Sequence, residues 1–139
     1  MGSAPRITYV LDTHVLLWFR IKPDELGPKT LRLLKKPETA IVISIVTALE
    51  VALLVHKGRI SLPQPVDTWF EVSLTLFQTK AYPLTPQIIS DAYTLPDPFY
   101  ADPADRLLVA TARVEELTLI TADQRILDYP AVPAWNGRT

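Results

Sequence analysis

The chain has 139 residues, a length typical of one domain, and we expect a single domain spanning residues 1–139. Hydrophobic residues make up 48% and charged residues 21%, a balance that supports an apolar core and excludes an intrinsically disordered chain. The formal net charge of −1 excludes a globally basic nucleic-acid binder, so any contact with nucleic acid has to be local. Cysteine is absent, which excludes disulfides and thiolate metal sites.

Neither the first residues nor the apolar runs indicate secretion or membrane insertion. The longest apolar run, residues 40–55, is too short for a transmembrane span and contains Ser44, Thr47 and Glu50. The initial Met-Gly-Ser-Ala lacks the charged and hydrophobic regions of a secretory signal. Together with the absence of cysteine, this predicts a cytoplasmic protein that does not associate with membranes.

The first third of the chain alternates between strand and helix patterns. Residues 7–11 are short, apolar and rich in β-formers, which predicts a buried strand, and residues 13–21 have the length of a short helix. Asp12 lies at the junction of the two. An amphipathic helix is predicted over residues 28–36 and a second buried strand over residues 40–45.

The middle of the chain is predicted to be mainly helical. Residues 47–56 form a helix that ends near Gly58, because glycine is the residue best suited to a helix C-terminus. A longer helix follows over residues 66–78 and a short strand over residues 80–84. Residues 86–93 then form a helix with proline in its first turn.

The last part of the chain repeats the alternation after a proline-rich loop over residues 96–102. A helix is predicted over residues 103–116, a strand over 117–121, a short helix from Asp123 and a last strand over 132–135. Because alternating strands and helices need crossover connections, we predict a three-layer α/β/α fold with a mainly parallel central sheet of four to five strands. Sites in such sheets form at the carboxyl ends of the strands.

Four acidic residues are placed to meet at that edge of the sheet. Asp12 and Asp123 directly follow apolar strands, and Glu50 and Asp105 lie one turn into helices that begin near the same edge. Converging carboxylates repel one another and are costly to keep ionised unless a cation neutralises them. Oxygen-only ligands suit hard ions such as Mg²⁺ or Mn²⁺. Two such ions can activate a water and stabilise the leaving oxygen of a phosphodiester displacement.

Helix capping is the alternative explanation for each acidic residue taken alone. Thr47 and Glu50 have the spacing of a capping box, in which the glutamate reaches back to the amide of the capping residue. Asp102 lies three residues before Asp105, which is the spacing of an N-cap and a favourable first-turn acid. The two aspartates that follow strands can likewise cap the helices after them.

Four segments of the chain, in order, resemble the PIN domains of VapC toxins. They are residues 11–18 (LDTHVLLW), 44–50, 102–106 together with 109–112, and 121–123. The resemblance implies an endoribonuclease that is directed at single strands, depends on Mg²⁺ or Mn²⁺ and acts as the toxin of a type II toxin–antitoxin pair. It also implies a small VapB-like antitoxin that binds over the active site. The resemblance and the apolar composition together predict a homodimer.

Functional roles follow from the resemblance by position. It assigns catalytic and metal-binding roles to four acids, Asp12, Glu50, Asp105 and Asp123. It assigns to Thr121 the role of orienting the last of them. The chain departs from the family in having Ala104 where many members have Phe, and Tyr100-Ala101 where many have His-Arg. These departures bear on substrate contacts and leave the metal site intact.

Asp102 and Arg106 flank the assigned Asp105 and each have two interpretations. Asp102 either joins the metal site or caps the helix, and the family spacing favours Asp105 as the ligand. Arg106 either steadies a phosphate or pairs with Asp102 or another acid, and we favour the ion pair.

Several other side chains have competing structural and functional interpretations. His14, in an apolar helix, is more typical of a packing residue than of a catalytic one. Aromatic residues in apolar helical surroundings favour core or dimer contacts over base stacking, and these are Trp18, Phe19, Trp69 and Phe70. A cluster of basic residues is typical of a solvated face, but it is also the best local candidate for attracting phosphates. It consists of Lys29, Arg32, Lys35 and Lys36.

Other α/β classes fit the sequence less well. A receiver-type signalling domain needs an early acidic pair and a lysine after a late strand, and neither arrangement is convincing here. A haloacid-dehalogenase-type phosphotransferase needs a second aspartate two residues after its nucleophile, where this chain has His14. The remaining alternative is a catalytically inactive PIN-like module that binds nucleic acid or protein, and the complete set of four acids argues against it.

Overall fold

The computed structural model describes residues 6–96, 98–99 and 101–139. Tyr100, one of the departures from the family pattern, lies outside the described residues, as do the first five residues. Five strands form one sheet in the order β3-β2-β1-β4-β5, and every neighbouring pair is parallel. The strands are β1 (Thr8–Leu11), β2 (Ala40–Ser44), β3 (Ala81–Tyr82), β4 (Thr118–Thr121) and β5 (Ala134–Asn136). The predicted parallel sheet is therefore confirmed.

Seven α-helices and one short 3-10 helix connect these strands in the described part of the chain. They are α1 (Thr13–Ile21), η1 (Pro23–Glu25), α2 (Pro28–Lys35), α3 (Ile45–His56), α4 (Val66–Leu76), α5 (Pro86–Ala92), α6 (Pro103–Val114) and α7 (Gln124–Leu127). In the described part of the chain, no helix is both long enough and apolar enough to cross a bilayer.

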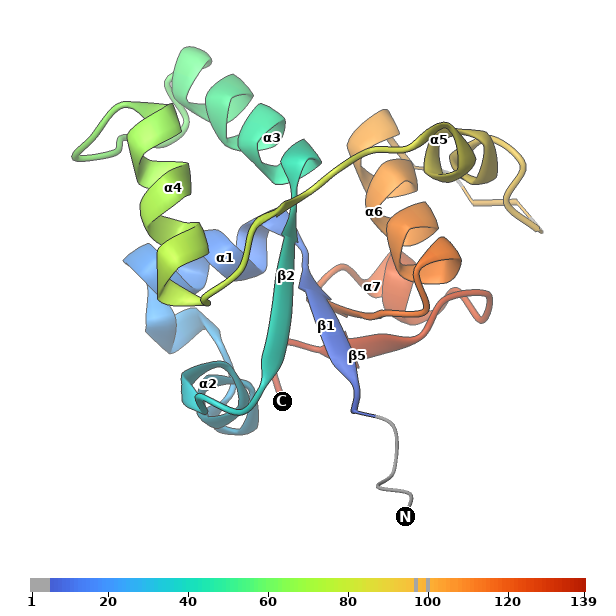
Figure 1. The fold of residues 1–139 in the computed structure, drawn as a ribbon, viewed down its shortest axis with the longest axis horizontal. Helices are drawn as coiled ribbons and strands as arrows, with labels where there is room; N and C mark the ends of the chain where they lie inside the picture. Colours follow the sequence, from blue (N-terminus) through green and yellow to red (C-terminus); the bar gives the residue numbers. More distant parts are fainter. Residues whose placement is uncertain (1–5, 97, 100) are drawn as a thin grey trace.

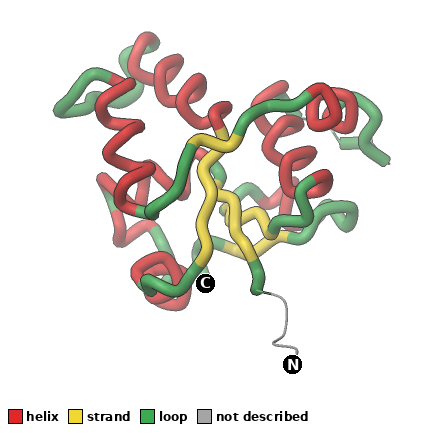
Figure 2. The backbone as a smooth tube through the Cα atoms, in the orientation of Figure 1, coloured by secondary structure: helices red, strands yellow, loops and turns green. Residues whose placement is uncertain are grey.

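Helices cover both faces of the sheet because the central strands are buried on both sides. In β1, Tyr9 and Leu11 point into a core that contains Trp69 of α4, whereas Val10 points into a second core that contains Leu108 of α6. Figure 1 shows α1, α2 and α4 on one side of the sheet and α5, α6 and α7 on the other. The strands accordingly lie between two groups of helices in Figure 2, which confirms the predicted three layers.

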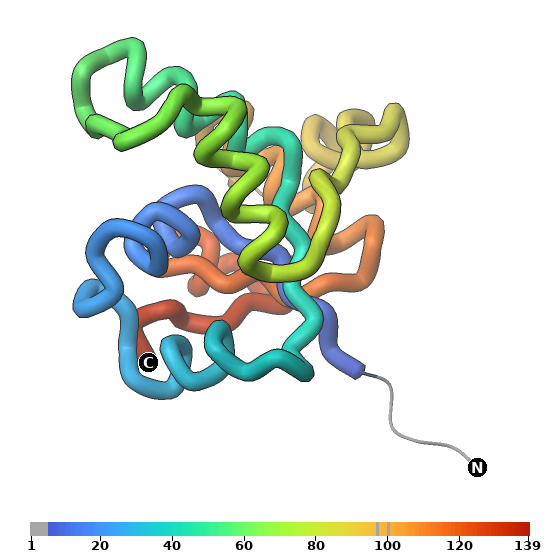
Figure 3. The backbone as a smooth tube through the Cα atoms, turned by 60° about the vertical axis from the view of Figure 1, so that its left-hand side comes forward, coloured from blue at the N-terminus to red at the C-terminus, as the bar shows by residue number. Residues whose placement is uncertain are grey.

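Helices α3 and α4 form a hairpin that extends away from the sheet, as the view in Figure 3 shows. Gly58, in the loop after α3, has a φ of 69°, the left-handed conformation that favours glycine. Trp69 and Phe70 of α4 are buried in the first core, which confirms their interpretation as core residues. The hairpin is attached to the sheet through both helices, because α3 follows β2 directly and buries Val46 and Val51, while α4 buries Trp69 and Phe70.

Strand β1 marks the point where the chain changes direction in the sheet. From β1 the chain continues to β2 and β3 on one side, and it later returns to β4 and β5 on the other side. The backbone amide of Asp12 donates to the carbonyl of Ile120 at 2.9 Å, which joins the ends of β1 and β4. Asp12 therefore lies at a topological switch point, where binding crevices form in open α/β sheets.

Candidate active site

Asp12 is a buried carboxylate at the carboxyl end of β1. Its Oδ2 accepts a 2.7 Å hydrogen bond from Oγ1 of Thr121, and its side chain makes no capping hydrogen bond to α1. Only 8% of the residue is exposed. Burial raises the pKa of Asp12, although the Thr121 hydrogen bond and the nearby His14 oppose that effect. Capping therefore does not explain this residue.

Glu50 lies on α3, and its carboxylate faces α1 across the site. Oγ1 of Thr13 donates to Glu50 Oε1 and lies 3.2 Å from Oγ1 of Thr47. Helix α3 begins at Ile45 because Ser44 Oγ accepts from the Val46 amide at 3.0 Å, so Ser44 is the N-cap.

The predicted capping box between Thr47 and Glu50 is therefore wrong, since both residues lie inside the helix. Burial raises the pKa of Glu50, and the negative charges of Asp12 and Asp102 raise it further.

Asp102 and Asp105 lie at the start of α6 and have different roles. Asp102 is the N-cap, because its Oδ1 accepts from the backbone amide of Asp105 at 2.9 Å. Asp105 is 9% exposed and points toward the other acids. Burial, followed by the charges of Asp102, Asp12, Glu50 and Asp123, raises the pKa of Asp105 to about 7. The four assigned acids are therefore close enough to influence one another.

Thr121 links two of the assigned acids at the end of β4. Its hydroxyl donates to Asp12 and accepts from the backbone amide of Asp123 at 3.0 Å. Asp123 also caps α7, because its Oδ1 accepts from the Arg125 amide at 2.9 Å. The capping interpretation therefore holds for Asp123, while its other oxygen faces the acidic pocket.

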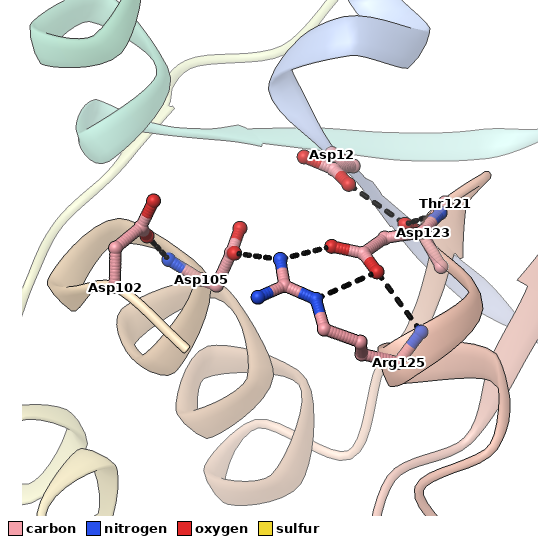
Figure 4. A network of polar contacts seen from close by, with 6 residues as sticks. All are labelled: Asp12, Asp102, Asp105, Thr121, Asp123 and Arg125. Atoms are coloured by element: carbon pink, nitrogen blue, oxygen red, sulfur yellow. Dashed lines mark hydrogen bonds and ion pairs between the residues drawn. The ribbon is translucent and has the colours of Figure 1, made fainter. Parts of the chain in front are cut away.

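Arg125 of α7 bridges two of the acids and was not singled out by the sequence (Figure 4). Its Nη2 donates to Asp123 Oδ2 at 2.7 Å and to Asp105 Oδ2 at 3.1 Å, and its Nε donates to Asp123 Oδ1 at 3.2 Å. The hydrogen bonds to Arg125 are the largest cause of the lowered pKa of Asp123. The one sequence signal for this contact is local, an arginine two residues after a capping aspartate.

The assigned acids line a single cavity of about 310 Å³. The lining residues are Asp12, His14, Trp18, Glu50, Asp102, Asp105, Ala122, Asp123 and Arg125. His14 therefore faces the site, which was the functional alternative to its interpretation as a packing residue. Trp18 also borders the site and packs against the first core, as predicted. A larger cavity of about 610 Å³ lies at the loop between α3 and α4 and has no acidic residue in its lining.

The donor set of this cavity fits a hard divalent cation by its chemistry, since it consists of crowded carboxylate oxygens without thiolates. In the present arrangement, with Arg125 joined to Asp105 and Asp123, no three His, Asp or Glu side chains among the described residues are grouped closely enough to hold an ion. Two of the acids are held by threonine hydroxyls and two by the guanidinium.

Arg106 does not line this cavity, and among the described residues it binds backbone carbonyls in place of the favoured ion pair with an acid. Its guanidinium donates to the backbone carbonyls of Ala92 at 3.2 Å and Phe99 at 2.8 Å, and it lies 5.5 Å from the ring centre of Tyr93. These contacts join α6 to α5 and to the loop before α6. The sequence did not indicate these partners, because backbone carbonyls are present at every residue and only the fold brings these two to Arg106.

The chain is similar in sequence to known proteins. A family model for the PIN domain matches residues 9–132. Ribonuclease VapC22 from Mycobacterium tuberculosis is 31% identical over 122 residues, which cover 88% of this chain and 92% of that protein.

Solved structures of low sequence identity share the fold. A chain of VapBC2 from Rickettsia felis, bound to a DNA fragment from its promoter, has a TM-score of 0.69 at 18% identity and covers 94% of this chain and 98% of its own length. A toxin–antitoxin complex from Klebsiella pneumoniae gives a TM-score of 0.63 at 16% identity, with coverage of 94% and 98%. By the family model and the ribonuclease relative, the chain belongs to the PIN domain family.

Proposed function

We propose that this chain is an endoribonuclease of the cytoplasm that depends on Mg²⁺ or Mn²⁺ and serves as the toxin of a toxin–antitoxin pair. The observation that carries the proposal is the convergence of Asp12, Glu50, Asp105 and Asp123 from four separate segments into one cavity. The relative named as a ribonuclease supports RNA cleavage as the reaction, and the toxin–antitoxin complex with the same fold supports the biological setting.

The four acids are the residues that would hold the divalent ion. When bound, such an ion supplies Lewis-acid activation of water and neutralises charge at the reacting phosphate. The protein contributes orientation, because Thr121 holds the Asp12 carboxylate and Thr13 holds that of Glu50. Crowding that raises the pKa of Asp105 to about 7 is relieved by a cation, so the cavity favours ion binding.

An adjoining cavity suits a nucleic-acid strand as the substrate. It has a volume of about 390 Å³ and shares His14 and Trp18 with the acidic cavity. Its lining combines the Trp18 ring with two cations, Lys22 and Arg59. Aromatic rings stack on bases and cations contact phosphates. This lining therefore supports the binding of single-stranded RNA in a cavity next to the four acids.

An antitoxin is the partner that we propose for an apolar surface beside Glu50. A third cavity of about 390 Å³ is lined by exposed Leu49 and Leu53 of α3 together with Glu50 and Asp102. Exposed apolar surface of this kind marks protein interaction sites. A small protein bound there would cover two acids of the site.

Homodimer formation stays a prediction, and light scattering of the purified chain tests it.

The test of the catalytic proposal is cleavage of structured and unstructured RNA with Mg²⁺ or Mn²⁺. We expect the parent chain to cleave single-stranded RNA and the variants Asp12→Asn and Asp105→Asn to lose activity by at least about a hundredfold. Asp67→Asn, an exposed position on α4, is the matched control and should cleave normally. Equal cleavage by all four proteins would contradict the proposal. RNA binding without cleavage by the parent would favour the inactive-module alternative.

A further inference from the structure

The Arg125 guanidinium occupies the position of a cation between two assigned metal ligands. It contacts Asp105, from α6, and Asp123, which precedes α7, through the bonds drawn in Figure 4. These two carboxylates otherwise belong to a crowded group, since the Asp105 carboxyl also experiences the charges of three further acids. The guanidinium therefore supplies the positive charge that a divalent ion would supply in the same place.

The two cations exclude each other for reasons of both space and charge. Asp105 Oδ2 and Asp123 Oδ2 each accept from the same Nη2 atom, so these oxygens cannot point at an ion while the contacts persist. A guanidinium keeps its charge throughout the physiological pH range, so deprotonation does not remove it. The side chain has to move instead, and its 57% exposure lets it turn toward solvent without opening the core.

We propose that Arg125 is a built-in counter-ion of the site, which competes with the divalent cation for Asp105 and Asp123 and swings outward when the ion binds. This inference rests on the proposed metal-dependent function. It explains why no three acids among the described residues are close enough to bind an ion while Arg125 contacts Asp105 and Asp123. Arg125 is thus a positioning residue that offsets the repulsion between the carboxylates whenever no ion is bound.

A second arginine–aspartate pair in the chain provides a comparison. Arg113 donates to Asp91 through Nε at 2.9 Å and through Nη2 at 3.3 Å, and its Nη1 donates to the Ala131 carbonyl at 2.8 Å. This pair is less exposed than Arg125, and neither Arg113 nor Asp91 lines the acidic cavity. A variant that removes this second pair shows whether the loss of any arginine–aspartate pair is enough to change ion binding.

The experiment is titration of the full chain with Mn²⁺ alone, monitored by calorimetry at about pH 8, which lies above the raised pKa of about 7 of Asp105. We expect Arg125→Gln to bind Mn²⁺ about tenfold more tightly than the parent, because a half-exposed ion pair no longer competes. Arg125→Lys retains the charge and should fall between the two. Arg113→Gln should match the parent, and circular dichroism checks the fold of each variant.

A second measurement follows the guanidinium itself. The Nε–H resonance of Arg125, assigned by its loss in Arg125→Lys, should shift when Mg²⁺ is added to the parent, whereas that of Arg113 should stay constant. Equal Mn²⁺ affinity in the parent and Arg125→Gln, or an unmoved Arg125 resonance at saturating Mg²⁺, would overturn the counter-ion proposal and leave the metal site standing. Absence of Mn²⁺ binding in every protein would overturn both.

Discussion

The hydroxyl of Thr121 donates a 2.7 Å hydrogen bond to Asp12 Oδ2, across 109 residues of sequence. Both residues are buried, and the same hydroxyl accepts from the Asp123 amide, so one side chain sets the geometry of two assigned acids. Hydrogen bonds that hold a metal-binding side chain in place orient it toward the ion, and their loss typically lowers metal affinity or activity by about 10- to 100-fold.

Replacement of Thr121 by Val keeps the shape of the side chain and removes the hydrogen bond. We expect RNA cleavage to fall by about 10- to 100-fold and the free energy of unfolding to fall by about 1–3 kcal/mol, because a buried acceptor is left without its donor. Cleavage assays and urea unfolding measure the two effects. Thr118→Val, at the other end of the same strand from Thr121, is the control and should retain activity. Normal cleavage by the Thr121 variant would show that the bond is not functional.

The raised pKa of Asp105 predicts a pH dependence of stability in metal-free protein. Because the folded-state pKa of about 7 lies above the usual 3.8, the folded state holds a proton that the unfolded state has released. The parent should therefore lose stability relative to Asp105→Asn as pH rises from about 4 to about 7, with no further loss above that range. Urea unfolding in the presence of a chelator, at a series of pH values, measures this difference. A difference that grows with pH in favour of the parent would contradict the burial argument.

A bound divalent ion should reverse that loss. Binding to the folded state alone stabilises it by about 2.7 kcal/mol at a concentration of a hundred times Kd, so Mn²⁺ should raise the unfolding temperature of the parent by several degrees. Asp12→Asn should show a much smaller rise, and Asp67→Asn should behave like the parent. Scanning calorimetry with and without Mn²⁺ provides the comparison. The same rise in all three proteins would indicate binding away from the assigned acids.

Two glycines are expected to resist replacement for different physical reasons. A Cβ at Gly27 would lie 2.1 Å from the carbonyl carbon of Thr139, so Gly27→Ala should separate these segments and cost about 1–3 kcal/mol. Gly58 has open space around it but a φ of +69°, so Gly58→Ala should cost about 1–2 kcal/mol through backbone strain. Urea unfolding tests both. Gly58→Asn, which tolerates this conformation better, should recover part of the loss.

The order of elements and the type of sheet could be predicted from the sequence, because hydrophobic periodicity and proline spacing act over a few residues. The positions of Asp12 and Asp123 directly after buried strands placed them at one edge of the sheet. Asp102 was also recognisable as a cap, since a cap and its acceptor lie three residues apart. Local rules failed at Glu50, where the capping box was displaced by a cap at Ser44.

The parallel α/β fold and the acids that gather at the carboxyl edge of its sheet follow from local sequence patterns. The groups that hold those acids depend on tertiary contacts. Thr13 reaches Glu50 across 37 residues, and Arg125 reaches Asp105 across 20. Such contacts depend on how the helices pack over the sheet, and this packing cannot be predicted from the spacing of residues in the sequence. The position of Arg106 against backbone carbonyls has the same cause.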